Sequence, residues 1–136
     1  MRFLVDSNVL SELTKPAPDE KVILWLRQHE PDLVVNPIIL GEIEYGILTM
    51  PAGHRRTRME EWFDRVIQTL ESVDLDKEAA AAWARLLADL KGRGLTMPVK
   101  DSLIAATALA HGFKVATRNT ADFKNAGVPV ENPFST

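Results

Sequence analysis

Four acidic residues stand out because each lies in or beside a segment whose pattern predicts a strand or a helix. Asp6 directly follows the apolar run Phe3-Leu4-Val5, and Asp101 opens an alanine-rich segment. Glu42 lies among apolar residues, and Asp122 follows another short apolar run. Carboxylate oxygens are the ligands that Mg²⁺ prefers, and water and substrate phosphates commonly complete its coordination. Four carboxylates on separate elements therefore suit the metal-assisted hydrolysis of a phosphodiester.

Three of these acids also have a plainer interpretation. Asp6 could cap a helix, but Ser7 and Asn8 could both serve as that cap, which favours a functional role for Asp6. Asp101 could lie where it does because a carboxylate at a helix start interacts favourably with the helix dipole. Asp122 alone could be a residue of a turn. The hypothesis of a common site therefore depends on the acids meeting in the fold.

The segment of residues 37–50, which we predict to be a helix, contains two candidate glutamates. Apolar residues surround Glu42, so we do not expect its carboxylate to be fully solvated, whereas Glu44 fits an ordinary exposed position. The pattern favours Glu42 only slightly and leaves both open. Gly46 lies on the same helical face as Glu42, four positions later, and would permit close approach of a neighbouring element.

Short apolar segments alternate with amphipathic ones along the chain. We predict strands over residues 2–6, 33–35, 72–75, 114–117 and 128–130, and helices over 9–13, 19–29, 37–50, 54–70, 77–91 and 101–111. Such alternation predicts an α/β fold with three layers, α/β/α, around a central, mainly parallel sheet. Ligands bind such sheets beyond the carboxyl ends of the strands, which directs attention to Asp6, Asn36 and residues 117–122.

The composition is that of an ordinary globular protein of 136 residues, and with no repeat or linker we expect one domain over 1–136. Cysteine is absent, which excludes thiol catalysis and cysteine-bound zinc. A net charge of −3 argues against coating nucleic acid through bulk positive charge, but leaves room for carboxylates that bind cations. Asp6 interrupts the apolar N-terminal run, so we expect no signal peptide or membrane span and a cytoplasmic location.

Several segments resemble the PIN-domain family of nucleases, specifically the VapC-type and FitB-like toxins. They are Val5-Asp6-Ser7-Asn8-Val9-Leu10-Ser11-Glu12-Leu13, residues 40–47 around Glu42, residues 101–108 from Asp101, residues 116–123 ending in Asp122-Phe123, and a closing Val130-Glu131-Asn132-Pro133-Phe134. The resemblance implies a compact α/β/α domain with endoribonuclease activity that depends on Mg²⁺ or Mn²⁺. It also implies the toxin of a type II toxin–antitoxin pair, which a cognate antitoxin protein restrains and which forms a homodimer or a toxin–antitoxin hetero-oligomer.

The resemblance also assigns roles to individual acids. Asp6, Glu42 and Asp101 occupy the family's first three acidic positions, which settles the choice between the two glutamates of the predicted helix. Asp122 is assigned as the fourth catalytic acid, although some relatives place an acid where this chain has Asn119. Asp6 and Asp101 would be the principal metal ligands. The implied reaction is hydrolysis of RNA through metal-activated water, leaving a 5′-phosphate and a 3′-hydroxyl.

Polar and basic neighbours complete the expected site. By the resemblance, Asn8 and Thr117 orient carboxylates or water, and Asn119 is a neutral neighbour. Arg118 and Lys100 are candidates for contacts with RNA phosphates. The basic run of residues 54–58 could also contact RNA, but such a run is more often the solvated start of a helix.

Other chemistry has weaker support. His29, His54 and His111 share no ligand spacing, and the three tryptophans, Trp25, Trp62 and Trp83, fit apolar helix faces better than base stacking. A phosphatase with an aspartyl nucleophile usually carries a second aspartate two residues later, where this chain has Asn. A PIN scaffold that binds RNA or a partner without cleavage is the remaining alternative.

Overall fold

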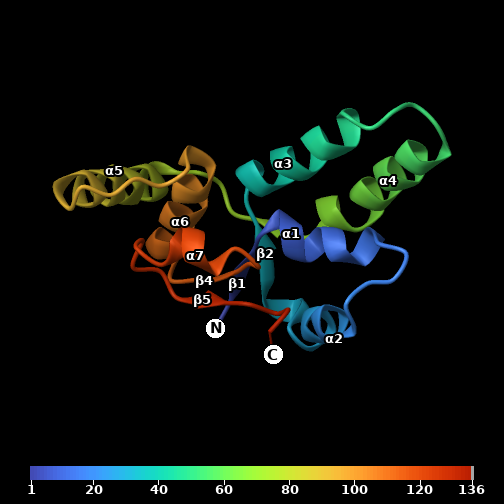
Figure 1. Cartoon of the computed structure of the whole chain (residues 1–136), viewed down its shortest axis with the longest axis horizontal. Helices are drawn as coiled ribbons and strands as arrows, with labels where there is room; N and C mark the ends of the chain where they lie inside the picture. Colours follow the sequence, from blue (N-terminus) through green and yellow to red (C-terminus); the bar gives the residue numbers. More distant parts are fainter. Residues whose placement is uncertain (136) are drawn as a thin grey trace.

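A five-stranded parallel sheet organises the computed structural model, which describes residues 1–135. Its strands are β1 (Phe3–Val5), β2 (Leu33–Val35), β3 (Glu71–Ser72), β4 (Lys114–Ala116) and β5 (Val130–Glu131). The spatial order is β3-β2-β1-β4-β5, and each neighbouring pair is parallel. The chain adds strands on one side of β1 and then returns to its other side, so the order reverses between β1 and β4 (Figure 1). A crevice at the carboxyl ends of these two strands is where such folds bind ligands.

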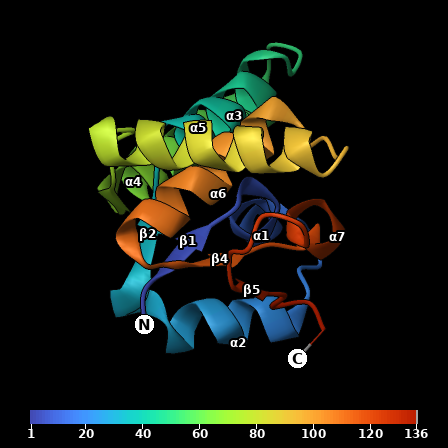
Figure 2. The same cartoon turned by 90° about the vertical axis from the view of Figure 1, so that its left-hand side faces the viewer.

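Helices cover both faces of this sheet. They are α1 (Ser7–Leu10), α2 (Glu20–Gln28), α3 (Pro37–Leu48), α4 (His54–Arg65), α5 (Lys77–Gly92), α6 (Val99–His111) and α7 (Thr120–Phe123), with 3₁₀ turns at Ser11–Thr14, Glu30–Asp32 and Ile67–Thr69. Figure 2 shows α2 on one side of the strands and α5 and α6 on the other. The predicted three-layer α/β/α fold is confirmed. Within residues 1–135, no helix combines the length and hydropathy that crossing a membrane requires.

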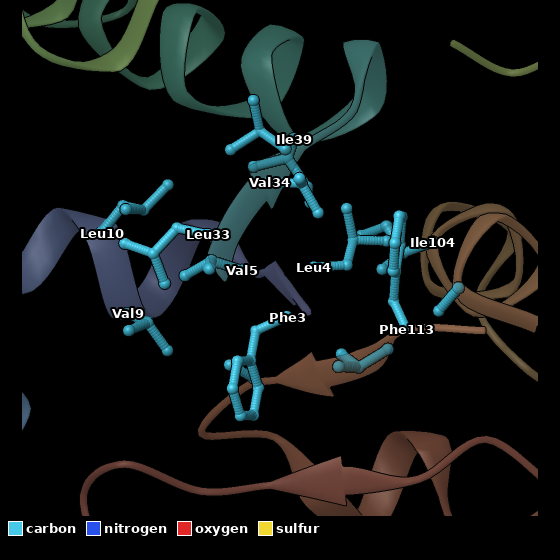
Figure 3. Close-up of a cluster of buried hydrophobic side chains, with 14 of the residues drawn as sticks. Phe3, Leu4, Val5, Val9, Leu10, Leu33, Val34, Ile39, Ile104 and Phe113 are labelled. Atoms are coloured by element: carbon cyan, nitrogen blue, oxygen red, sulfur yellow. The ribbon is translucent and has the colours of Figure 1, made fainter. Parts of the chain in front are cut away.

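The core lies between the central strands and the helices that cross them. The segments Phe3–Val5 and Leu33–Val35 are buried at every position, which is why they are continuously apolar and do not alternate. Leu4, Val34, Ile39 and Ile104 belong to this cluster and are labelled in Figure 3. The core therefore joins β1 and β2 to α3 and α6, two of the elements that carry predicted site residues.

Several predicted boundaries were wrong for identifiable reasons. The helix expected over 54–70 ends at Arg65, and a 3₁₀ turn then keeps Ile67 buried, so the apolar pattern continues although the α-helix does not. The strand expected over 72–75 is Glu71–Ser72. The final strand is Val130–Glu131 instead of 128–130, because Pro129 has no N–H to donate to a neighbouring strand.

The helix expected over 101–111 begins two residues earlier, at Val99. Pro98 stands immediately before it, in the extended conformation of a residue that precedes a helix. Asp101 consequently lies within the first turn, where its carboxylate faces inward and is buried.

Candidate active site

Asp6 lies at the carboxyl end of β1, beside the point where the strand order reverses. Its backbone is extended, with φ −68° and ψ 155°, and its N–H donates to the carbonyl oxygen of Ala116 at the end of β4. Its Oδ1 accepts a 2.8 Å hydrogen bond from the backbone N–H of Ser7, so Asp6 itself caps α1. The expectation that Ser7 or Asn8 would form this cap was wrong, because Asp6 is the last residue before the chain turns into the helix.

The second carboxylate oxygen of Asp6 is held by two neutral side chains. Oδ2 accepts hydrogen bonds from the hydroxyl of Thr117 at 2.8 Å and from Nδ2 of Asn8 at 3.3 Å. Asn8 also accepts from the backbone N–H of Arg118 at 3.0 Å, which ties α1 to the segment after β4. Thr117 is fully buried. These bonds fix the orientation of the Asp6 carboxylate.

Asp101 lies nearby in α6 and is only 8% exposed. Burial raises the pKa of its carboxyl to about 6, and the negative charges of Asp6, Asp122 and Glu42 contribute to the rise, against the opposing charge of Lys100. The pKa of Asp6 is also raised, chiefly by burial and in part by Glu42, although the hydrogen bonds from Thr117 and Ser7 oppose the shift. The charge of Glu42 thus acts on both buried carboxyls, and that of Asp122 acts on Asp101.

Glu42 is turned toward two partners on other elements. Its side chain is 25% exposed, in agreement with the expectation that it would not be fully solvated, whereas Glu44 is exposed. Oε1 accepts a 2.7 Å hydrogen bond from the hydroxyl of Ser7, and Oε2 forms an ion pair with the ammonium of Lys100. Since the backbone N–H of Ser7 also bonds Asp6, Ser7 links two acids of the site. We expected Ser7 to act only as a helix cap, and this link was not predicted, although Ser7 lies between Asp6 and Asn8 in the sequence.

The two candidates for the fourth acidic position lie close together in the chain but differ in their contacts. Asp122 is exposed in the first turn of α7, and its charge raises the pKa of Asp101. Asn119 precedes the same helix and is exposed, and its backbone N–H donates to the hydroxyl of Thr117 at 3.1 Å. Asp122 is thus coupled to the buried acids through charge, and Asn119 through its backbone.

Arg118 interacts with Phe134 and Glu12. The guanidinium lies over the ring of Phe134, 4.6 Å from its centroid, and its charge contributes to lowering the pKa of Glu12. Glu12 is buried, pairs with Lys15 at 2.9 Å and accepts a 2.7 Å hydrogen bond from the backbone N–H of Asp19. This role of Glu12 was not predicted from the sequence: it binds the backbone of Asp19, the residue that caps α2.

A groove of about 640 Å³ opens beside Ser7 and Glu42. It runs between α3 and α4, which project together with their connecting turn from one side of the molecule (Figure 1). Its lining includes Ser11, Gly46, Met50, His54, Arg55, Met59 and Trp62. A Cβ atom at Gly46 would meet nothing within 4 Å, so no neighbouring element makes use of the close approach that this glycine permits, and Gly46 lines the open groove instead. His54 and Arg55, the first two residues of the basic segment 54–58, line this groove.

The histidines and tryptophans have other surroundings. His29 stacks on Trp25, which is buried against Phe3, and His111 lies 3.4 Å from a carboxylate oxygen of Asp76. Trp83 donates to the hydroxyl of Ser102 at 2.9 Å. In residues 1–135, no group of three or more histidine, aspartate or glutamate side chains is placed to hold a metal ion together.

The acids nevertheless fit a hard cation by the chemistry of their donor atoms. Mg²⁺ is commonly held by one or two carboxylates, with water and phosphate oxygens as its other ligands, so two aspartates suffice. The raised pKa values of Asp6 and Asp101 reflect negative charge that burial and neighbouring carboxylates leave without full compensation. A divalent cation would supply that compensation.

Fold and site together define a parallel α/β protein with an acidic centre at the reversal of strand order. The family model for the PIN domain matches residues 3–129, and the chain belongs to the PIN domain family. The chain is 38% identical to the VapC ribonuclease Y4jK of Sinorhizobium fredii, with 97% of each chain covered. It is 33% identical to the toxin FitB of Neisseria gonorrhoeae, over 97% of this chain and 98% of FitB.

The likeness extends to three dimensions. A chain in the crystal structure of FitAcB from Neisseria gonorrhoeae superposes with a TM-score of 0.91 at 32% identity, over 98% of this chain and 99% of that one. A chain in the structure of FitAB bound to the IR36 DNA fragment matches with the same TM-score and identity. The arrangement of strands and helices described above is therefore that of solved PIN-domain proteins.

Proposed function

We propose that this chain is a metal-dependent endoribonuclease, with Mg²⁺ as its ion and Mn²⁺ as a substitute, and that it acts in the cytoplasm as the toxin of a type II toxin–antitoxin pair. The observation that carries the proposal is the pair of buried carboxylates, Asp6 and Asp101, at the reversal of strand order, each with a raised pKa. The names of the relatives, VapC ribonuclease and toxin FitB, support both the reaction and the biological role.

In this proposal Asp6 and Asp101 hold the ion, and Asn8 and Thr117 keep the Asp6 carboxylate in position through their hydrogen bonds. The bound ion supplies Lewis acidity, which activates water and neutralises charge on the scissile phosphate. Glu42 and Asp122 add negative charge and accept the proton released by the attacking water. Lys100 and Arg118 contact RNA phosphates, Asn119 is a neutral neighbour, and the products carry a 5′-phosphate and a 3′-hydroxyl.

The proposed protein partner is a cognate antitoxin. Support comes from the solved neighbours, which are chains of FitAcB and of FitAB bound to a DNA fragment. A second copy of the chain is a further expected partner. The apolar side chains of Tyr45 and Leu48 are 70% and 55% exposed on α3, and such surface is available for contact with another chain.

The test is cleavage of total RNA by purified, antitoxin-free protein. Wild-type protein should cut RNA in Mg²⁺ and stop when a chelator is added. Asp6→Asn and Asp101→Asn should abolish cutting, whereas Asp64→Asn, a matched change at an exposed position of α4, should not. Unchanged cutting by both site variants would reject the site, and RNA binding without cutting by the wild type would favour the silent scaffold. A phosphorylated Asp6 trapped during turnover would favour the phosphatase.

The toxin role needs a separate measurement in cells. Expression of the wild-type chain should arrest growth, and co-expression of the small gene next to its own should relieve the arrest. The Asp101→Asn variant should not arrest growth at all. If this variant arrested growth as strongly as the wild type, toxicity would not depend on the proposed reaction.

A further inference from the structure

The ammonium of Lys100 lies among the acids of the site. It forms an ion pair with Oε2 of Glu42, although the two residues are 58 positions apart in the sequence. Lys100 also directly precedes Asp101 in α6. The ion pair therefore places a positive charge between two elements that carry acids of the site, α3 and α6.

We infer that the ammonium of Lys100 takes the place of a second divalent cation, so that this nuclease works with a single bound metal ion. The inference rests on the proposed function, which assigns the first ion to Asp6 and Asp101. It goes beyond that function because it gives the number of ions and names the residue that determines it.

The contacts of Glu42 are the main argument. A second ion in this site would need carboxylate oxygens besides those of Asp6 and Asp101. The two oxygens of the partly buried Glu42 carboxylate, on α3, are available in this position. Both of those oxygens already have partners, because Ser7 donates to Oε1 and Lys100 pairs with Oε2. A second cation at Glu42 would have to displace the ammonium of Lys100 from the Glu42 carboxylate. If the ammonium stayed, the two positive charges would lie side by side and repel each other strongly.

The position of Lys100 in the fold gives a second argument. Lys100 directly precedes Asp101 in the first turn of α6, so its backbone is fixed relative to a proposed metal ligand. Its side chain is 49% exposed and can therefore face substrate as well as Glu42. A tethered ammonium placed in this way can neutralise charge on the scissile phosphate, which is the role that a second ion has in two-metal sites.

The competing interpretation is an ordinary surface ion pair, which contributes little to stability or function. Under that interpretation, removal of the Lys100 charge would leave the number of bound ions unchanged. Lys15 provides a matched control because it also forms an ion pair with a glutamate. Its partner is the buried Glu12, on the segment between α1 and α2.

The experiment titrates purified, full-length, antitoxin-free protein with Mn²⁺. Electron paramagnetic resonance measures the unbound ion, and the number of ions bound per chain follows by difference from the total. The wild type, Lys100→Arg and Lys15→Met should each bind one ion per chain. The neutral variants Lys100→Met and Lys100→Gln should bind two, and circular dichroism spectra should match the wild type. The count for the neutral variants is a readout independent of activity.

Each other result has a definite meaning. Two ions bound by the wild type, or one ion bound by both neutral variants, would overturn the role of Lys100 while leaving the proposed ribonuclease intact. No ion bound by the wild type at millimolar Mn²⁺ would instead reject the proposed metal site, and the inference with it.

Discussion

The candidate site has two halves that are built differently. At the ends of β1 and β4, Asp6 is buried and held by hydrogen bonds from Ser7, Asn8 and Thr117. At the edge of the groove between α3 and α4, Glu42 is partly exposed and is held by the ion pair with Lys100 and the hydroxyl of Ser7.

The difference shows which contacts are easily rearranged. The buried half depends on hydrogen bonds of 2.8–3.3 Å from neutral donors, and the sheet and α1 position the backbones of these donor residues. The groove half depends on two long side chains that solvent can reach, so substrate or a partner can replace their contacts. Removal of an acid from the buried half should therefore have a larger effect than removal of Glu42.

The largest effect is expected at Asp101. Asp101→Asn removes a charged oxygen ligand but keeps the size of the side chain, so RNA cleavage should fall by at least about 10²–10³-fold, the scale on which single electrostatic contacts act in active sites. Initial rates on a defined RNA measure it. Asp64→Asn should retain the wild-type rate, and equal rates for the two variants would remove Asp101 from the site.

Glu42 should matter less than the buried acids. Glu42→Gln removes a proton acceptor and the partner of Lys100, and we expect a loss of about 10²-fold, the lower end of the range for acid–base groups. Glu44→Gln is the control, because Glu44 lies on the same helix but is exposed. A greater loss for the control would mean that the wrong glutamate of α3 has been assigned.

Thr117 tests the hydrogen bonds that orient Asp6. Thr117→Val keeps the shape of the side chain but removes the 2.8 Å bond to Oδ2 of Asp6. We expect Mn²⁺ affinity to fall by about 10–100-fold, as it does when partners that orient metal ligands are lost. Titration with Mn²⁺ followed by calorimetry measures it, and Thr69→Val, on an exposed 3₁₀ turn, is the control. Unchanged affinity would show that Thr117 has only a packing role.

A change in stability that depends on pH is also expected. The pKa of Asp101 is raised from 3.8 to about 6 in the folded protein, so between these values the folded state binds more protons than the unfolded state. The Asp101 contribution to the free energy of unfolding is therefore greatest below pH 4, falls as pH rises, and is lost above about pH 6, by up to about 3 kcal/mol at about 1.4 kcal/mol per pKa unit. Burial of Asp6 adds a shift in the same direction.

Urea unfolding in chelator at several pH values checks this. Asp101→Asn should be more stable than the wild type at pH 7, and the difference should shrink toward pH 4. A difference that is constant across this range would mean that the Asp101 carboxyl titrates normally in the folded protein. Saturating Mn²⁺ should stabilise the wild type at pH 7 more than the variant, since the ion compensates the same charge.

The sequence predicted the buried half of the site better than the groove half. Asp6 could be identified because it directly follows a buried parallel strand, and such strand ends converge at a ligand crevice. The three-layer fold followed from the alternation of short apolar runs with amphipathic segments. These features depend on local sequence pattern, because the end of a strand in a parallel sheet fixes where the next residue lies.

The groove half depends on contacts between distant parts of the chain. The pair of Glu42 with Lys100, and the link that Ser7 makes between Asp6 and Glu42, arise only when α1, α3 and α6 are packed together. Apolar neighbours in the sequence could not separate Glu42 from Glu44. The residues around Gly46 likewise do not reveal the groove between α3 and α4, which depends on how these two helices pack.

The most direct test of the account is a crystal structure of the wild-type protein grown with Mn²⁺, with anomalous scattering used to locate the ion. The account predicts one peak, with carboxylate oxygens of Asp6 and Asp101 as its protein ligands and Lys100 still paired with Glu42. An ion bound elsewhere in the chain, or full occupancy of a site that includes neither aspartate, would contradict it.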